Sequence, residues 1–127
     1  MIKVLLIAAG GAAGTLLRYW MSGLAYKFGG EAFPWGTLAV NLIGAFFIGL
    51  LWGLTAHSSL SSQLRAMLFI GLFGGFTTFS TFALESFNLL KDQQFRNAFY
   101  YILASNIAGI VLVFAGLILA RFITQLK

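Results

Sequence analysis

The sequence predicts an all-α membrane protein with four transmembrane helices, and two observations lead to this fold class. Of the 127 residues, 60% are hydrophobic and only 9% are charged, and the mean hydropathy is +0.92. A chain of this size cannot bury so many apolar side chains in a soluble core, so lipid is the expected solvent. The charged residues are also widely spaced, and they leave uncharged intervals at residues 4–17, 32–64, 66–84 and 97–120. We expect one multi-pass domain, residues 1–127.

The first predicted helix covers about residues 4–21, and its uncharged part is the shortest. A bilayer-spanning helix needs about 20 mostly apolar residues. This segment therefore spans only if Arg18 lies near an interface or is sheltered by neighbouring helices. The apolar start could pass for a signal peptide, but "GGAAGTLLRYW" offers no convincing cleavage site. We predict a retained helix.

The second and fourth predicted helices, about residues 35–56 and 97–122, are long enough to span the bilayer. They contain polar residues, Asn41 in the second and Ser105 and Asn106 in the fourth. Such groups are costly in a membrane unless they are hydrogen-bonded or hydrated. Hydrogen bonding between helices is one interpretation of each residue, and a polar path is the other.

The third predicted helix, about residues 66–90, contains "GGFTTFSTF" at Gly74–Phe82. Two adjacent glycines weaken a helix and threonines lose side-chain freedom in one, so we expect a break near its middle. Carbonyl groups freed by a break cannot face lipid, and protein, water or a bound ion must satisfy them. A bound cation is one hypothesis, and a simple kink or glycine packing is the other.

Aromatic residues follow the expected break, and Phe79 and Phe82 share a helix face because they are three positions apart. The edge of an aromatic ring carries partial positive charge. Amide and hydroxyl donors together with such edges, and without a basic residue in mid-membrane, would suit a small anion that accepts hydrogen bonds. Arg18 and Glu85 are the charges nearest to the spans, and each has a structural interpretation as well, by snorkelling or by marking a helix end.

The basic residues predict the assembly, because the face richer in Lys and Arg stays cytoplasmic. With four helices both termini share one face. That face would carry Lys3, Arg65, Arg121 and Lys127, and the opposite face would carry Arg18, Lys27, Lys91 and Arg96. Four against four favours neither orientation, so we expect insertion both ways up and an antiparallel, dual-topology homodimer. The alternative is that one residue sets a single orientation.

Several function classes are excluded by composition. The chain has no cysteine, three acidic residues and one histidine, His57, which we place in an exposed loop. Nothing among them has the spacing of a catalytic set or a metal-ligand cluster, so we predict no enzyme. The net charge of +5 comes from dispersed helix-end residues, so we predict no nucleic-acid partner.

Taken together, the motifs resemble the Fluc (CrcB-type) family of bacterial fluoride channels. The resemblance rests on "GGAAGTLLRY" at residues 10–19, "GTLAVNLIGAFFIG" at 36–49 and "GGFTTFSTF" at 74–82, in that order over nearly the whole chain. It implies a dual-topology homodimer in the inner membrane that exports fluoride from the cytoplasm by passive electrodiffusion. It also implies two pores and a central structural sodium ion.

The resemblance further implies roles for individual residues. Backbone carbonyls of Gly74 and Thr77 from both copies would hold the sodium ion. Phe79, Phe82 and Asn41 would line the pores. A polar track would be formed by four residues, Ser80, Thr81, Tyr101 and Ser105. Glu85 would lie along the pore, and Arg18 would lie near a vestibule.

Two other functions remain possible from the residues. A small dual-topology, proton-coupled multidrug exporter also has four helices, but it needs a titratable carboxylate deep in a cavity, and only Glu85 is available. An assembly factor without transport would leave Asn41 and the hydroxyl-rich break unexplained.

Overall fold

A computed structural model describes residues 1–30, 32–56, 58 and 60–125 of the chain. In these ranges the secondary structure is helical, without strands. The described residues contain four helices that are long and apolar enough to cross a membrane. The all-helical fold with four apolar helices of membrane-spanning length is therefore as predicted. The loop position expected for His57 lies outside the described residues.

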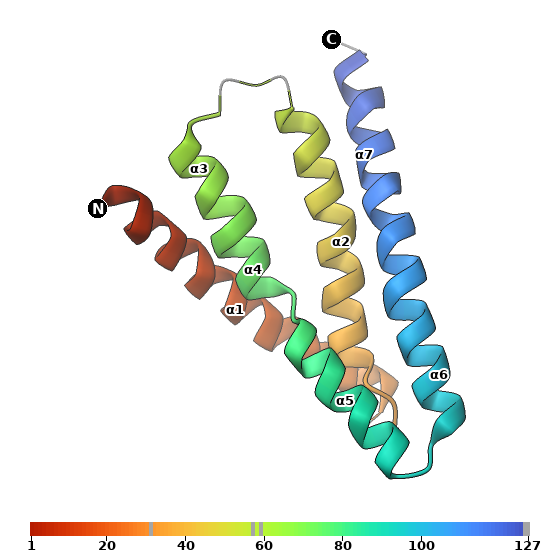
Figure 1. Ribbon diagram of the computed structural model, residues 1–127. Helices are drawn as coiled ribbons and strands as arrows, with labels where there is room; N and C mark the ends of the chain where they lie inside the picture. The colour runs from red at the N-terminus through yellow and green to blue at the C-terminus, as the bar shows by residue number, and fades with distance from the viewer. Residues whose placement is uncertain (31, 57, 59, 126–127) are drawn as a thin grey trace.

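The first two spans are single helices, α1 (Ile2–Gly29) and α2 (Trp35–Thr55). The other two spans are segmented. The third is made of α3 (Ser62–Ala66), η1 (Met67–Leu72), α4 (Phe73–Phe76) and α5 (Phe79–Lys91), and the fourth of α6 (Phe95–Leu103), η2 (Ala104–Ala108) and α7 (Gly109–Gln125). The segments η1 and η2 are π-helical. The chain ends N and C lie at one end of the molecule, and the turn between α5 and α6 lies at the other (Figure 1).

The first helix is longer than expected, because it continues past Met21 to Gly29. The charge of Arg18 does not end it, since this side chain is half-buried and lines a cavity between α1 and α5. The helix ends where Gly30 adopts φ 76°, a backbone conformation that glycine reaches without steric cost.

Helix backbones approach closely where glycines face a neighbouring helix. A Cβ atom at Gly10 of α1 would clash with the carbonyl oxygen of Met67 in η1. Likewise, a Cβ atom at Gly49 of α2 would clash with the carbonyl oxygen of Val113 in α7. The helices α2 and α7 run side by side along most of their length (Figure 1). Small residues at such contacts are the usual basis of helix association in membranes.

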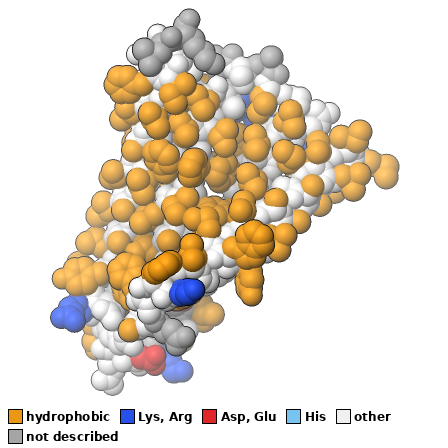
Figure 2. Space-filling model, turned by 180° about the vertical axis from the view of Figure 1, so that it is seen from behind, with side chains coloured by type: hydrophobic (Ala, Val, Ile, Leu, Met, Phe, Trp, Pro, Cys, Tyr) orange, Lys and Arg blue, Asp and Glu red, His pale blue; other side chains and the backbone are white. Residues whose placement is uncertain are grey.

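The outer surface is mostly apolar. Figure 2 shows hydrophobic side chains over most of one face, with the larger visible patches of Lys, Arg and acidic side chains near one end. Large residues such as Trp20 and Phe114 are well exposed, at 70% and 60%. A surface of this kind is unstable in water and is matched to the hydrocarbon core of a bilayer.

Candidate functional site

The third span contains two extended residues between α4 and α5 (Figure 1). Thr77 has φ −86° and ψ 161°, and Thr78 has φ −149° and ψ 122°. The Oγ1 atom of Thr78 accepts a hydrogen bond of 3.3 Å from the backbone N–H of Thr81. Thr78 therefore acts as the N-cap that starts α5.

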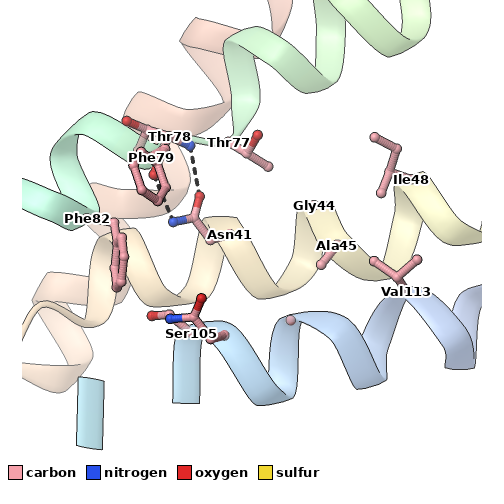
Figure 3. Close-up of a pocket in the computed structure, with 12 residues that line it drawn as sticks. Asn41, Gly44, Ala45, Ile48, Thr77, Thr78, Phe79, Phe82, Ser105 and Val113 are labelled. Carbon is pink, nitrogen blue, oxygen red and sulfur yellow. Dashed lines mark hydrogen bonds between the residues drawn. The ribbon is translucent and has the colours of Figure 1, made fainter. Parts of the chain in front are cut away.

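Asn41 of α2 holds this extended segment with two hydrogen bonds (Figure 3). Its Nδ2 donates to the carbonyl oxygen of Thr78 at 3.0 Å, and its Oδ1 accepts from the backbone N–H of Thr78 at 2.8 Å. One side chain thus satisfies both backbone groups of Thr78. A side-chain amide has two N–H donors, and this bridge uses one of them.

The same contacts redirect two backbone N–H groups away from their helical acceptors. In a regular α-helix the N–H of residue i bonds to the carbonyl of residue i−4. The N–H of Thr78 would then bond to Gly74 and that of Thr81 to Thr77, but they donate to Oδ1 of Asn41 and Oγ1 of Thr78. The carbonyl oxygens of Gly74 and Thr77 thereby lose their helical donors.

Carbonyl oxygens of this kind are suitable ligands for a hard cation. Gly74 and Thr77 are the two residues for which a sodium-binding role was predicted. Among the described residues, no group of three or more His, Cys, Asp or Glu side chains could hold a metal ion.

A cavity of about 330 Å³ lies beside the break, between α2 and the fourth span. Phe79 and Phe82 lie next to each other on its wall, with ring centroids 5.7 Å apart (Figure 3). The Phe82 ring also packs on Tyr101 at 5.2 Å. We call this space the central cavity; its lining includes Asn41, Gly44, Thr77, Thr78, Phe79, Phe82, Ser105 and Asn106.

The two polar residues of the fourth span differ in their bonding. Asn106 donates from Nδ2 to the carbonyl oxygen of Ile102 at 2.7 Å, so its own helix accepts one of its two N–H donors. The Oγ atom of Ser105 is buried and has no hydrogen-bond partner within the described part of the chain. Both residues belong to the π-helical segment η2, a geometry often found at functional sites. Ser105 thus brings a hydroxyl group with free bonding capacity to the central cavity.

Glu85 is held by hydroxyl groups from three other helices. Its Oε1 atom accepts from the Tyr26 hydroxyl at 3.0 Å and from Thr37 Oγ1 at 2.9 Å. Its Oε2 atom accepts from the hydroxyl of Tyr101 at 2.7 Å. Tyr101 is fully buried and Thr37 is 4% exposed. Four spans therefore meet at one carboxylate, and its oxygen atoms are satisfied by neutral donors.

A second cavity, about 510 Å³ in volume, lies between α1 and α5, and we call it the vestibule cavity. Arg18, Thr81 and Glu85 line it, and Thr78 lines both this cavity and the central one. Ser80 lines neither cavity: its side chain is exposed, with Oγ 3.5 Å from Oγ1 of Thr78. The residues singled out in the sequence therefore fall into two neighbouring groups that meet at Thr78.

Sequence reasoning missed Tyr26 and Thr37. The only signal in the sequence is that each hydroxyl residue occurs in or beside an apolar run. They are separated from Glu85 by 59 and 48 positions. Their convergence depends on how α1, α2 and α5 cross, and no local spacing encodes that crossing.

Comparison with known proteins identifies relatives along the whole chain. A family model described as CrcB-like protein, Camphor Resistance (CrcB), matches residues 5–117. A protein of Parabacteroides distasonis is 45% identical over 128 residues, covering 100% of both chains. A protein of Geobacter sulfurreducens is 50% identical over 122 residues, covering 95% of this chain and 98% of its own. Both relatives are named fluoride-specific ion channel FluC.

A third relative agrees with these two. A protein of Solidesulfovibrio magneticus with the same name is 47% identical over 122 residues, covering 95% of this chain and 98% of its own. These relatives are channels rather than enzymes, so the prediction that the chain is not an enzyme is confirmed.

Proposed function

Since the chain belongs to the CrcB-like family, whose model matches residues 5–117, we propose that it is a channel through which fluoride leaves the bacterial cytoplasm across the inner membrane. The names of the relatives support fluoride as the ion. The hydrogen-bond donors that line the central cavity support the same ion on physical grounds.

The single observation that carries this proposal is the buried Ser105 hydroxyl, which has no partner in the described part of the chain and lines the central cavity. Fluoride is a small anion that accepts hydrogen bonds strongly, and a pore must replace its water with donors. Ser105 can donate, Asn41 retains one N–H, and the edges of Phe79 and Phe82 carry partial positive charge.

We propose that fluoride moves between the vestibule cavity and the central cavity past Thr78. Arg18 would attract the anion to the vestibule. Hydroxyl donors would then take over the role of its water. This polar track would consist of Ser80, Thr81, Tyr101 and Ser105, with Glu85 beside it.

Transport of this kind needs no coupled energy source. A membrane potential that is negative inside drives an anion outward, by about 2.3 kcal/mol per charge for each 100 mV. We therefore propose passive electrodiffusion.

We propose further that two copies pair in opposite orientations around a sodium ion. Each copy would contribute the carbonyl oxygens of Gly74 and Thr77, and each dimer would contain two pores. The displaced N–H groups of Thr78 and Thr81 support this, because they leave those oxygens for another ligand. Gly74 also has open space where a side chain would begin, with no atom within 4 Å, so a second backbone could approach there.

Efflux from liposomes tests the channel proposal. Purified protein is reconstituted into vesicles loaded with potassium fluoride, and fluoride release is followed with an ion-selective electrode after valinomycin is added. We expect rapid fluoride release and, in matched vesicles, no release of chloride. Uptake of a cationic dye driven by a pH gradient, without fluoride release, would instead identify the proton-coupled exporter. Release of neither solute would contradict a transport function.

A further inference from the structure

Tyr26 lies near the end of α1, and its ring rests against the start of α2. A Cβ atom at Gly36 would clash with this ring. The glycine therefore leaves the space that the ring occupies. The backbone of α2 at Gly36 therefore packs directly against one side of the ring. The Tyr26 hydroxyl donates a hydrogen bond of 3.0 Å to Oε1 of Glu85.

The hydroxyl of Tyr26 is the link from α1 to this carboxylate. Thr37 of α2 shares Oε1 with it, and Tyr101 of α6 binds Oε2. Without the Tyr26 hydroxyl, the carboxylate would keep its hydrogen bonds to α2 and α6 but would lose its hydrogen bond to α1. A hydrogen bond to a charged group is among the stronger polar contacts in a protein.

Tyr26 and Glu85 also share a position between two cavities. Both line the vestibule cavity, which contains Arg18. Both also line a smaller cavity of about 200 Å³ near the turn between α5 and α6, with Asp92 and Gln94 on its wall. The bonded pair therefore forms part of the wall that separates the vestibule cavity from the turn-side cavity.

We propose that Tyr26 is a positioning residue for anion passage. Its hydroxyl holds the Glu85 carboxylate against this wall, at the edge of the vestibule cavity, so that the negative charge does not swing farther into that cavity, where it would repel an anion. This inference rests on the proposed fluoride-channel function.

The test is fluoride efflux from liposomes with Tyr26→Phe, which keeps the ring and removes only the hydroxyl. We expect the efflux rate to fall about tenfold, as the loss of one hydrogen bond to a charged group allows. Tyr100→Phe is the matched control, because Tyr100 is 57% exposed on the outer surface of α6, and its efflux should equal that of the unaltered protein. Gel filtration checks that each variant assembles normally.

A double-mutant cycle separates positioning from a general structural role. If Tyr26 acts through Glu85, adding Tyr26→Phe to Glu85→Gln should change efflux by less than about twofold, whereas independent roles give losses that multiply. Gly36→Ala keeps the hydroxyl but displaces the ring, and it should lower efflux as Tyr26→Phe does.

Several outcomes would overturn the inference. They are normal efflux in Tyr26→Phe, multiplied losses in the double variant, or a Tyr26→Phe protein that fails to assemble, because the hydroxyl would then serve folding. Absence of fluoride efflux from the unaltered protein would instead overturn the proposed function itself.

Discussion

Phe79 and Phe82 line the same cavity but have different surroundings. Phe79 is 78% exposed, whereas Phe82 is partly buried and packs on Tyr101. If both rings serve only to fill space, Phe82 should matter for stability and Phe79 should matter little. If both offer their edges to an anion, both should matter for conduction.

We predict that Phe79→Ile and Phe82→Ile each reduce fluoride efflux about tenfold, because isoleucine keeps the apolar bulk but lacks the positive ring edge. The cost in stability should stay below about 1.5 kcal/mol. Efflux per assembled protein is measured in liposomes, with thermal unfolding and gel filtration as controls. Near-normal efflux in both variants would exclude the two rings from conduction.

For single residues, the sequence indicated which polar side chains need a partner but not which partner each one has. Asn41 stood out because a lone amide in an apolar span needs a partner. Its partner, the backbone of Thr78, lies 37 positions away, and a sequence does not state which backbone groups have left a helix. Glu85 stood out as a charge near a span, but the hydroxyls of Tyr26 and Thr37 could not be assigned to it.

At the scale of the helices, the spans were predictable and their ends were not. Hydropathy alone identifies four apolar segments, because lipid exposure acts on every residue of a span. The end of α1 was misplaced: the helix was expected to stop near Met21, but it continues to Gly29, and Arg18, for which shelter by neighbouring helices was one of two alternatives, lines a cavity between α1 and α5. The fourth span also begins and ends beyond its expected limits, at Phe95 and Gln125.

The extended segment at Thr77 and Thr78 leads to a prediction about sodium. A ligand that binds only the assembled protein stabilises it, so if the proposed sodium ion is held between two copies, removing sodium should destabilise the proposed dimer. We expect protein purified in choline chloride to unfold at a lower temperature than protein in sodium chloride, and to lose fluoride efflux. Re-addition of sodium should restore both properties.

The control for this prediction is potassium chloride at the same ionic strength, which separates an effect of sodium from an effect of salt. A fully active dimer with unchanged thermal stability after exhaustive sodium depletion would show that no structural sodium is needed.

At the scale of the whole molecule, the placement of charge bears on assembly. Among the described residues, Lys3, Arg65 and Arg121 belong to the start of α1, to α3 and to the last part of α7, whereas Lys27, Lys91 and Arg96 belong to the end of α1, the end of α5 and the start of α6. Figure 1 shows the turn between α5 and α6 at the end of the molecule opposite to α3 and the last part of α7. Arg18 lies within α1 rather than in a link. Neither end has a large excess, which is the condition for insertion in both orientations.

We predict that paired lysine substitutions at one end fix the orientation. Gln93→Lys with Gln94→Lys should bias the chain one way, and Ser62→Lys with Gln63→Lys should bias it the other way; all four side chains are exposed. Either variant expressed alone should lose fluoride efflux, and co-expression should restore it, because an antiparallel dimer needs both orientations.

Accessibility of a tag at the carboxyl end, assayed from both sides of the membrane, provides the readout of orientation. The unaltered protein should show both orientations in comparable amounts. A single orientation in the unaltered protein would contradict the antiparallel arrangement.

The pairing of α2 with α7 has a consequence for biosynthesis. The ribosome makes the whole third span between completing α2 and beginning the fourth span, yet the Gly49 face of α2 fits the backbone of α7 in that fourth span. During that interval the nascent chain offers this small-residue face to lipid or to the insertion machinery. The Gly49 face of α2 therefore acquires its neighbour only when the last described span enters the membrane, so an early stop in translation leaves α2 packed against α1 but with this face uncovered.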